Sequence, residues 1–167
     1  VHANGVISKL NPLTVTASTG QTIPVSIFDS VKPARSPEEQ MEEAEAKAAE
    51  SGDKLPVVFL LEEIGNSCDD RGDYPAALRY FKQQLQLAEE MQNDEEIARA
   101  ASKTGNVLGS MGQHAEAKAT HEKHLEIARR TGDVGGEGGA YGNIGLALHS
   151  MGKNAEAKAM QENHRGS

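Results

Sequence analysis

The sequence predicts an all-α helical-repeat solenoid that carries an N-terminal β-hairpin arm. Aromatic residues make up only 4% of the 167 residues and Trp is absent, which disfavours a sandwich or barrel of aromatic-rich strands. The sequence matches itself at an offset of 40 residues, which is typical of a repeat architecture. The first 35 residues differ in composition from the rest. The chain has about the size of one domain and can bury a sizeable core.

Residues 1–35 contain no Glu and a single acidic residue, Asp29. Around a polar link at residues 18–21, apolar residues alternate with polar ones, a spacing that predicts the two strands of a β-hairpin. A lone two-stranded hairpin is marginal in water, so we expect it to pack on the repeats, to add to a partner's sheet, or to be disordered in isolation. Our hypothesis is a docking arm within a larger assembly. Its expected docking residues are Leu13, Val15, Ile23, Val25, Ile27 and Phe28.

Residues 36–52 form the next predicted element, a half-repeat capping helix. Ser36 can cap it, Pro37 suits its first position, Glu39 completes a Ser-x-x-Glu capping box, and Gly52 ends it. At an offset of 40, its Ala48 falls on an alanine in each of the next two units. We therefore interpret this segment as the second helix of a degenerate repeat. Its six Glu and one Lys suit either a basic partner surface or a solvated helix.

Three full units follow, at 53–92, 93–132 and 133–167, and the last helix of the third is short or truncated. The dipeptides that align at the turn of each unit are Arg71-Gly72, Met111-Gly112 and Met151-Gly152. Apolar residues recur at helical spacing on both sides of these glycines, which tolerate the backbone reversal between two helices. The expected helices are 55–71, 74–91, 94–111, 114–131, 135–151 and 154–163.

The spacing resembles the tetratricopeptide repeat (TPR) family, in the 40-residue variety of Leu-Gly-Asn repeat adaptors and kinesin light chains. The matching positions are a bulky residue at Leu61, Ala101 and Tyr141, the Leu-Gly pair at Ile64-Gly65, Thr104-Gly105 and Ile144-Gly145, a large residue at Cys68, Leu108 and Leu148, and a small residue at Ala77, Ala117 and Ala157. The resemblance implies a curved array whose first helices line a concave, protein-binding groove.

The candidate groove residues are polar residues of the three first helices. They are Glu62, Asn66, Asp69, Arg99, Ser102, Asn106, Asn143 and His149. An asparagine carries a donor and an acceptor, so Asn66 and Asn106 could pair with a partner's backbone. The alternative is that these residues form solvated helix faces. The carboxylate clamp of the family needs several basic residues, and only Arg99 and Lys103 are near.

The last two units depart from the family pattern. The second-helix aromatic Phe81 becomes His121 and then Gln161, so the later units should bury less apolar area and be less stable. The first helix of the third unit also holds several glycines. Each interior Gly weakens a helix by about 1 kcal/mol relative to Ala.

No motif for chemistry is found. The single cysteine, Cys68, is expected to be a buried structural thiol, and the histidines lack partners at zinc-site spacing, so no metal or cofactor is expected. The sequence has neither a phosphate-binding loop nor a Gly-x-Ser-x-Gly elbow. A formal charge of −8 disfavours nucleic acid, and the longest apolar run, 57–61, is too short to cross a membrane.

These observations predict a non-catalytic protein-interaction scaffold or accessory subunit of a larger assembly, with protein partners and no cofactor. One alternative is a mobile adaptor that binds a short peptide in the groove, and an enzyme is the remaining alternative. We expect a soluble intracellular protein, either cytoplasmic or organellar after removal of a targeting segment. The sequence does not name the partner.

Overall fold

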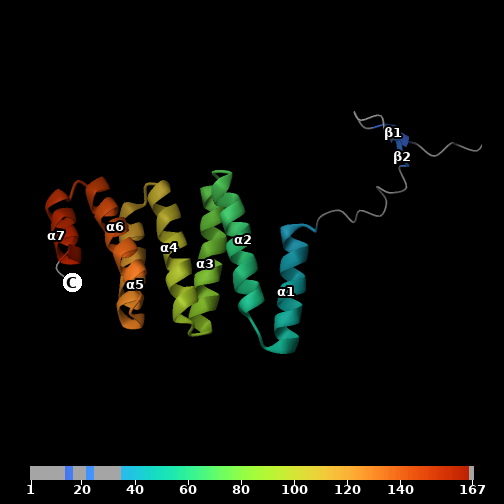
Figure 1. Ribbon diagram of the computed structural model, residues 1–167, viewed down its shortest axis with the longest axis horizontal. Helices are drawn as coiled ribbons and strands as arrows, with labels where there is room; N and C mark the ends of the chain where they lie inside the picture. The colour runs from blue at the N-terminus through green and yellow to red at the C-terminus, as the bar shows by residue number, and fades with distance from the viewer. Residues whose placement is uncertain (1–13, 17–21, 25–34, 166–167) are drawn as a thin grey trace, which may run out of the picture. The chain divides into compact units, whose positions relative to one another are not determined.

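A computed structural model describes residues 14–16, 22–24 and 35–165 (Figure 1). The chain divides into two compact units, Val1–Ser36 and Pro37–Ser167. In the first unit, strands β1 (Thr14–Thr16) and β2 (Thr22–Pro24) pair antiparallel, with Val15 opposite Ile23. Four of the expected docking residues lie outside the described residues: Leu13, Val25, Ile27 and Phe28.

The second unit is an all-α helical repeat, as the sequence predicts. Its helices are α1 (Pro37–Ser51), α2 (Leu55–Asp70), α3 (Tyr74–Glu90), α4 (Asp94–Ser110), α5 (His114–Thr131), α6 (Val134–Ser150) and α7 (Asn154–Arg165). Each begins and ends within two residues of its expected position. Consecutive helices pack on each other, and the first helices of successive units also meet, α2 with α4 and α4 with α6. None of the described helices combines the length and the hydropathy that a bilayer crossing requires.

The turns between the helices repeat in detail. Gly72, Gly112 and Gly152 have φ angles of +74°, +77° and +74°, a left-handed conformation in which a side chain is strained. The N–H of the next residue then donates to a carbonyl five residues back, as from Asp73 to Cys68 at 2.9 Å. These bonds satisfy carbonyls at the end of the first helix and turn the chain into the second. The expectation of a glycine reversal is confirmed at all three positions.

The core follows the 40-residue spacing as well. Ala77, Ala117 and Ala157 are all buried in the second helices. Cys68 is buried, as expected, in a cluster with Ala77 and Phe81. The small alanine side chains allow the helices of a unit to approach closely, and the larger apolar residues then fill the space between units.

Helix α6 forms without a break despite its glycines. Its buried residues are Ala140, Tyr141, Ile144, Gly145, Ala147 and Leu148, which pack on one side of the helix against α5 and α7. Burial of this apolar side offsets the weak helix propensity of the remaining glycines. Packing, and not propensity, therefore holds the first helix of the third unit.

Candidate partner-binding face

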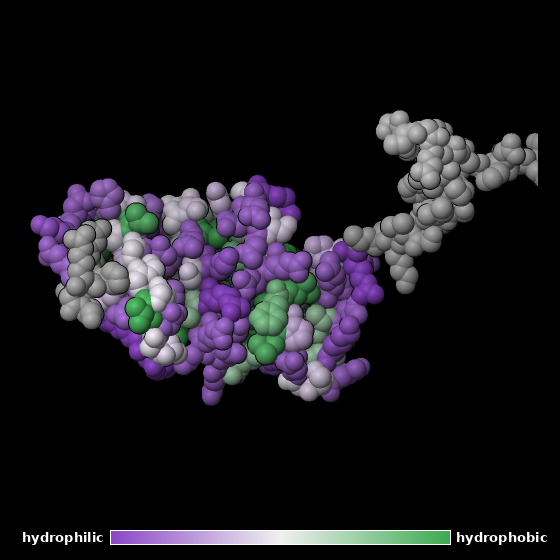
Figure 2. All heavy atoms as spheres, viewed as in Figure 1, coloured by the Kyte–Doolittle hydropathy of each residue, from purple (hydrophilic) through white to green (hydrophobic). Residues whose placement is uncertain are grey.

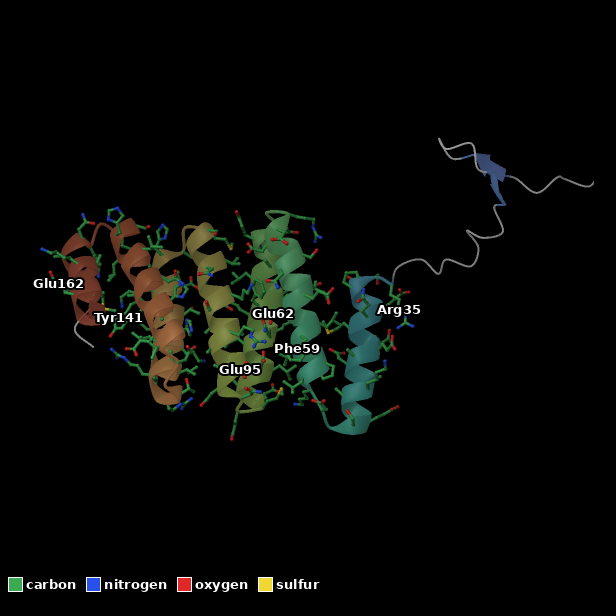
Figure 3. All side chains as sticks on the ribbon, viewed as in Figure 1. Arg35, Phe59, Glu62, Glu95, Tyr141 and Glu162 are labelled. Carbon is green, nitrogen blue, oxygen red and sulfur yellow. The ribbon has the colours of Figure 1, made fainter. Side chains whose placement is uncertain are left out.

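The first helices of the three units share one largely polar surface, here called the inner face. It consists of residues of α2, α4 and α6 that lie beside the contacts between these helices: Phe59, Glu62, Asn66, Glu95, Arg99, Ser102, Lys103, Asn106 and Asn143. Figure 3 shows Phe59 and Glu62 on α2 and Glu95 on α4. Hydrophilic side chains dominate the surface in the same view, and a hydrophobic patch interrupts them over α2 (Figure 2).

One side-chain hydrogen bond repeats along the inner face. The Lys103 ammonium donates to Asn66 Oδ1 at 2.9 Å, and Asn143 Nδ2 donates to Asn106 Oδ1 at 3.2 Å. Asn66 and Asn106 are 40 residues apart, as are Lys103 and Asn143, so the same contact links α4 to α2 and α6 to α4. Each bond uses the asparagine oxygen. The Nδ2 amides of Asn66 and Asn106 are left to donate to a partner.

Arg99 is the centre of a second cluster. Its guanidinium contacts Glu95 at 2.9 Å, Glu96 at 3.2 Å and Glu62 at 3.9 Å. Glu62 also accepts a hydrogen bond from the buried Gln84 at 3.2 Å. Three carboxylates around one cation leave the cluster with a net negative charge, which favours a basic or amide-bearing partner group.

Glu96 differs from the other two carboxylates because its side chain is only 5% exposed. Burial raises its pKa, and the nearby Arg99 opposes this shift. Glu96 lies in the first turn of α4, where Asn93 caps the helix by accepting the Glu96 N–H at 3.3 Å. The cap fixes the first turn of α4, and this turn holds the Glu96 carboxylate beside Arg99.

Two hollows adjoin the inner face. One, of about 630 Å³, is lined by Glu95, Arg99, Ser102, Lys103, His124 in the middle of α5 and residues 131–133 at its end. The other, of about 390 Å³, is lined by residues that include Asn106, Asn143, His121 and Leu146. A partner side chain therefore has room beside both the Arg99 cluster and the asparagine bond.

The expected groove residues fall into two groups. Glu62, Asn66, Arg99, Ser102, Asn106 and Asn143 lie together on the inner face. Asp69 is half-buried near the end of α2 and makes no hydrogen bond with them. His149 bonds to Asn154 at 2.8 Å and lines a separate hollow with Lys158.

Sequence reasoning missed Phe59 and Glu95. Phe59 is 48% exposed and occupies the position of Arg99 in the unit before it. The 40-residue offset could have found it, because Phe59, Arg99 and Gly139 share one position. Glycines also replace Glu95 and Ser102 in α6, at Gly135 and Gly142, so the polar surface thins out in the third unit.

His121 and His124 lie beneath these hollows, and both are buried with an unpartnered Nδ1. Burial, with a smaller contribution from the neighbouring His124, lowers the pKa of His121 to about 4. Burial also lowers the pKa of His124, against the opposing charge of Asp133. Both rings are therefore neutral at pH 7. The described part of the chain holds no group of three metal-ligating side chains.

Repeated helix pairs with a polar surface on their first helices define a helical-repeat scaffold for protein interactions. A tetratricopeptide repeat family model matches residues 57–130 and 96–164, which together span more than half of the chain. The chain belongs to the tetratricopeptide repeat family.

Two solved structures share the fold. The TPR domain of Arabidopsis FLU is 24% identical with a TM-score of 0.61, over 65% of this chain and 92% of that domain. BtubC (BKLC) from P. vanneervenii is 17% identical with a TM-score of 0.63, over 77% of this chain and 55% of that one. The match thus spans little more than half of BtubC. A comparison with curated proteins finds no match.

Proposed function

We propose that the chain is a non-catalytic scaffold or accessory subunit that holds a protein partner on its inner face. The observation that carries this proposal is the repeated bond from Lys103 to Asn66 and from Asn143 to Asn106. It fixes both asparagines, so a partner that accepts from their Nδ2 amides does not have to order them on binding.

The chemistry of the inner face favours an extended peptide segment of the partner. Peptide carbonyls would accept from the two asparagine amides, while Glu62 and Glu95 would attract a basic side chain. Phe59 adds an exposed aromatic ring, and aromatic residues are enriched at protein interfaces. Together these groups combine backbone recognition with one charged and one apolar contact.

If the chain is an accessory subunit, the arm is its second binding surface, in addition to the inner face. Val15 and Ile23 pair across β1 and β2, and apolar residues alternate with polar ones along the arm. A two-stranded sheet has an open edge on each strand, so strand addition to a partner's sheet is the docking mode that we propose. The arm would then hold the chain in its assembly and leave the inner face to bind a segment.

The first experiment is the native mass of the protein in a gentle extract, followed by identification of the protein that co-migrates. The binding test is the triple variant Phe59→Ser, Asn66→Ala and Asn106→Ala, in which Arg99 is kept so that Glu96 remains paired. We expect at least about a tenfold loss of partner affinity, since two or three interface anchors are removed. Thermal unfolding must show that the variant still folds.

The two forms of the proposal make opposite predictions about the arm. For an accessory subunit, deletion of residues 1–35 releases the chain from the co-migrating assembly, and the triple variant stays incorporated. For a mobile adaptor, the triple variant loses its partner and the deletion does not. If the triple variant keeps both the partner affinity and the co-migration of the wild type, the proposal that the inner face binds the partner is wrong.

A further inference from the structure

A fourth hollow lies between α1 and α3 and has α2 as its floor. It measures about 690 Å³ and includes none of the inner-face residues. Its apolar lining consists of Met41 on α1, Val57 and Leu61 on α2, and Tyr80 and Leu87 on α3. We call it the α1–α3 groove.

The next pair of second helices, α3 and α5, is joined by an ion pair that the corresponding residues of α1 and α3 cannot form. Lys123 of α5 forms an ion pair with Glu89 of α3, which bridges these two helices. Forty residues earlier the corresponding residues are Gln83 and Ala49, and Ala49 has no side chain that could reach across. The α1–α3 groove therefore lacks the bridge that joins α3 to α5.

Helix α1 also leaves apolar surface uncovered. It contains no buried residue. Met41 corresponds to Phe81, which is fully buried one unit later, yet Met41 is only half-buried. The same holds for Ala48, whose counterpart Ala88 is fully buried. Met41, whose counterpart forms the core in the next unit, thus lines an open groove here.

The rim of the groove is acidic. Glu38, Glu42 and Glu45 follow one another at i, i+4 and i+7, so they lie along one side of α1. No ion pair within the described residues neutralises them. On the other wall, Glu90 is paired with Lys54 and the guanidinium of Arg79 stacks on the Tyr80 ring, 4.9 Å from its centroid. The free charge at the rim is therefore predominantly negative.

We propose that the α1–α3 groove binds a basic amphipathic helix of a partner protein. An apolar stripe would cover Met41, Tyr80 and Leu87, and flanking Lys or Arg side chains would meet the three carboxylates of α1. From Arg79 to Glu90 the wall extends about 16 Å at 1.5 Å per residue, which matches three helical turns of a ligand. Nucleic acid and anionic membranes carry the same sign of charge as the rim and are disfavoured.

This proposal goes beyond the proposed function, because it adds a second partner class at a separate surface.

The binding experiment uses a labelled synthetic helix of about 14 residues as its probe, with Leu at i, i+4, i+7 and i+11 and Lys on both flanks. Its control carries Glu in place of Lys. The 167-residue protein is titrated with each peptide at low and at high salt. We expect binding of the Lys peptide only, weakened by salt because the rim is exposed.

The charge test compares two triple variants that remove the same net charge. Glu38→Gln, Glu42→Gln and Glu45→Gln should weaken binding by about fivefold or more, as expected for the loss of three exposed ion pairs. Glu63→Gln, Glu116→Gln and Glu126→Gln change exposed carboxylates outside the groove and should stay within about twofold. Equal losses in both triples would overturn the proposal, since the peptide would then sense net charge alone.

The occupant is identified by a photocrosslinking benzoylphenylalanine at Gln83, an exposed residue of the groove. Crosslinking to the Lys peptide supports the proposal. A product with residues 1–35 of the same chain, or with a second copy, overturns it by showing another occupant. The inner-face variant Asn66→Ala and Asn106→Ala should keep full peptide affinity. A loss in that variant would place the peptide on the inner face and also overturn the proposal.

Discussion

Phe81 lies against Gly65 so closely that a Cβ at residue 65 would stand 2.6 Å from the Phe81 ring. One unit later, His121 takes the same place against Gly105, again with 2.6 Å to a Cβ. The glycine of the Leu-Gly pair is therefore a packing requirement in the first two units, since it lets an aromatic ring of the second helix touch the backbone of the first, whereas a Cβ at Gly145 would meet nothing within 4 Å. This contact sets how closely the two helices approach.

Gly65→Ala should destabilise the protein. The added methyl group collides with a fully buried ring, and overpacking of this kind costs about 1–3 kcal/mol, more than the roughly 1 kcal/mol that Ala gains in helix propensity. The matched control is Gly109→Ala, because a Cβ there meets nothing within 4 Å. Urea denaturation should show a lower midpoint for the first variant and an equal or higher one for the second. A Gly65→Ala protein as stable as the control would contradict the packing requirement.

His121→Phe should stabilise the second unit. The histidine is 3% exposed and its Nδ1 has no partner, so the core holds a desolvated polar atom that Phe would remove. A buried unsatisfied group costs about 1–3 kcal/mol, and we expect a gain near the lower end because the ring must refit against Gly105. Thermal and urea unfolding at pH 7 measure it.

The same histidine makes stability depend on pH. Burial lowers the pKa of His121 to about 4, whereas the unfolded chain titrates near 6.5. Protonation therefore favours the unfolded state as the pH falls below 6.5. The stability that depends on a neutral His121 is fully present above pH 6.5 and is lost as the pH falls toward 4. Between pH 7 and pH 5 the loss due to His121 should be about 2 kcal/mol, and His121→Phe should remove that part of the pH dependence while the part due to His124 remains. His149→Gln, at an exposed histidine, serves as the control and should keep the wild-type slope.

The repeat period made the helices, the turns and Ala77 with its counterparts predictable. These features depend on residues close in sequence, or on small residues that every unit must place between its helices. The glycines of the turns are the clearest case, because a positive φ is a local property of the chain. The sequence alone therefore predicts the helices, the turns between them and the small buried residues.

The inner-face contacts were not predictable in the same way. Lys103 and Asn66 are 37 residues apart, and their meeting depends on how α4 is rotated against α2, which no local pattern encodes. Glu96 shows the same limit, since an acidic residue in a first helical turn is expected in solvent. Asn66 and Asn106 were expected to serve a partner, and part of their hydrogen-bonding capacity is instead used within the chain.

Arg99→Leu should destabilise the protein, because it leaves the buried Glu96 carboxylate without its ion pair. Without the guanidinium at 3.2 Å, a carboxylate that is 5% exposed loses its ion pair, which we expect to cost about 2 kcal/mol at pH 7. Since burial already raises the pKa of Glu96, protonation at lower pH should narrow the difference from the wild type. The double variant Arg99→Leu with Glu96→Gln should recover most of the loss. Glu95→Gln, at a 79% exposed carboxylate, should change stability by less than about 0.5 kcal/mol.

Gly139→Ala with Gly142→Ala should stabilise α6, because a Cβ at either position meets nothing within 4 Å. Each change should contribute up to about 1 kcal/mol through helix propensity. Gly136→Ala is the control in the same helix. There a Cβ would collide with the carboxylate of Asp133, which caps α6 by accepting the Gly136 N–H at 2.9 Å.

Loss of that cap costs about 1 kcal/mol, so Gly136→Ala should show no net gain. Urea midpoints and ellipticity at 222 nm distinguish the variants. Equal or lower stability of the double variant would mean that helix propensity does not limit the third unit. A gain together with full partner affinity would show that Gly139 and Gly142 are not needed for a partner's close approach, whereas a gain with lost affinity would assign them to the binding surface.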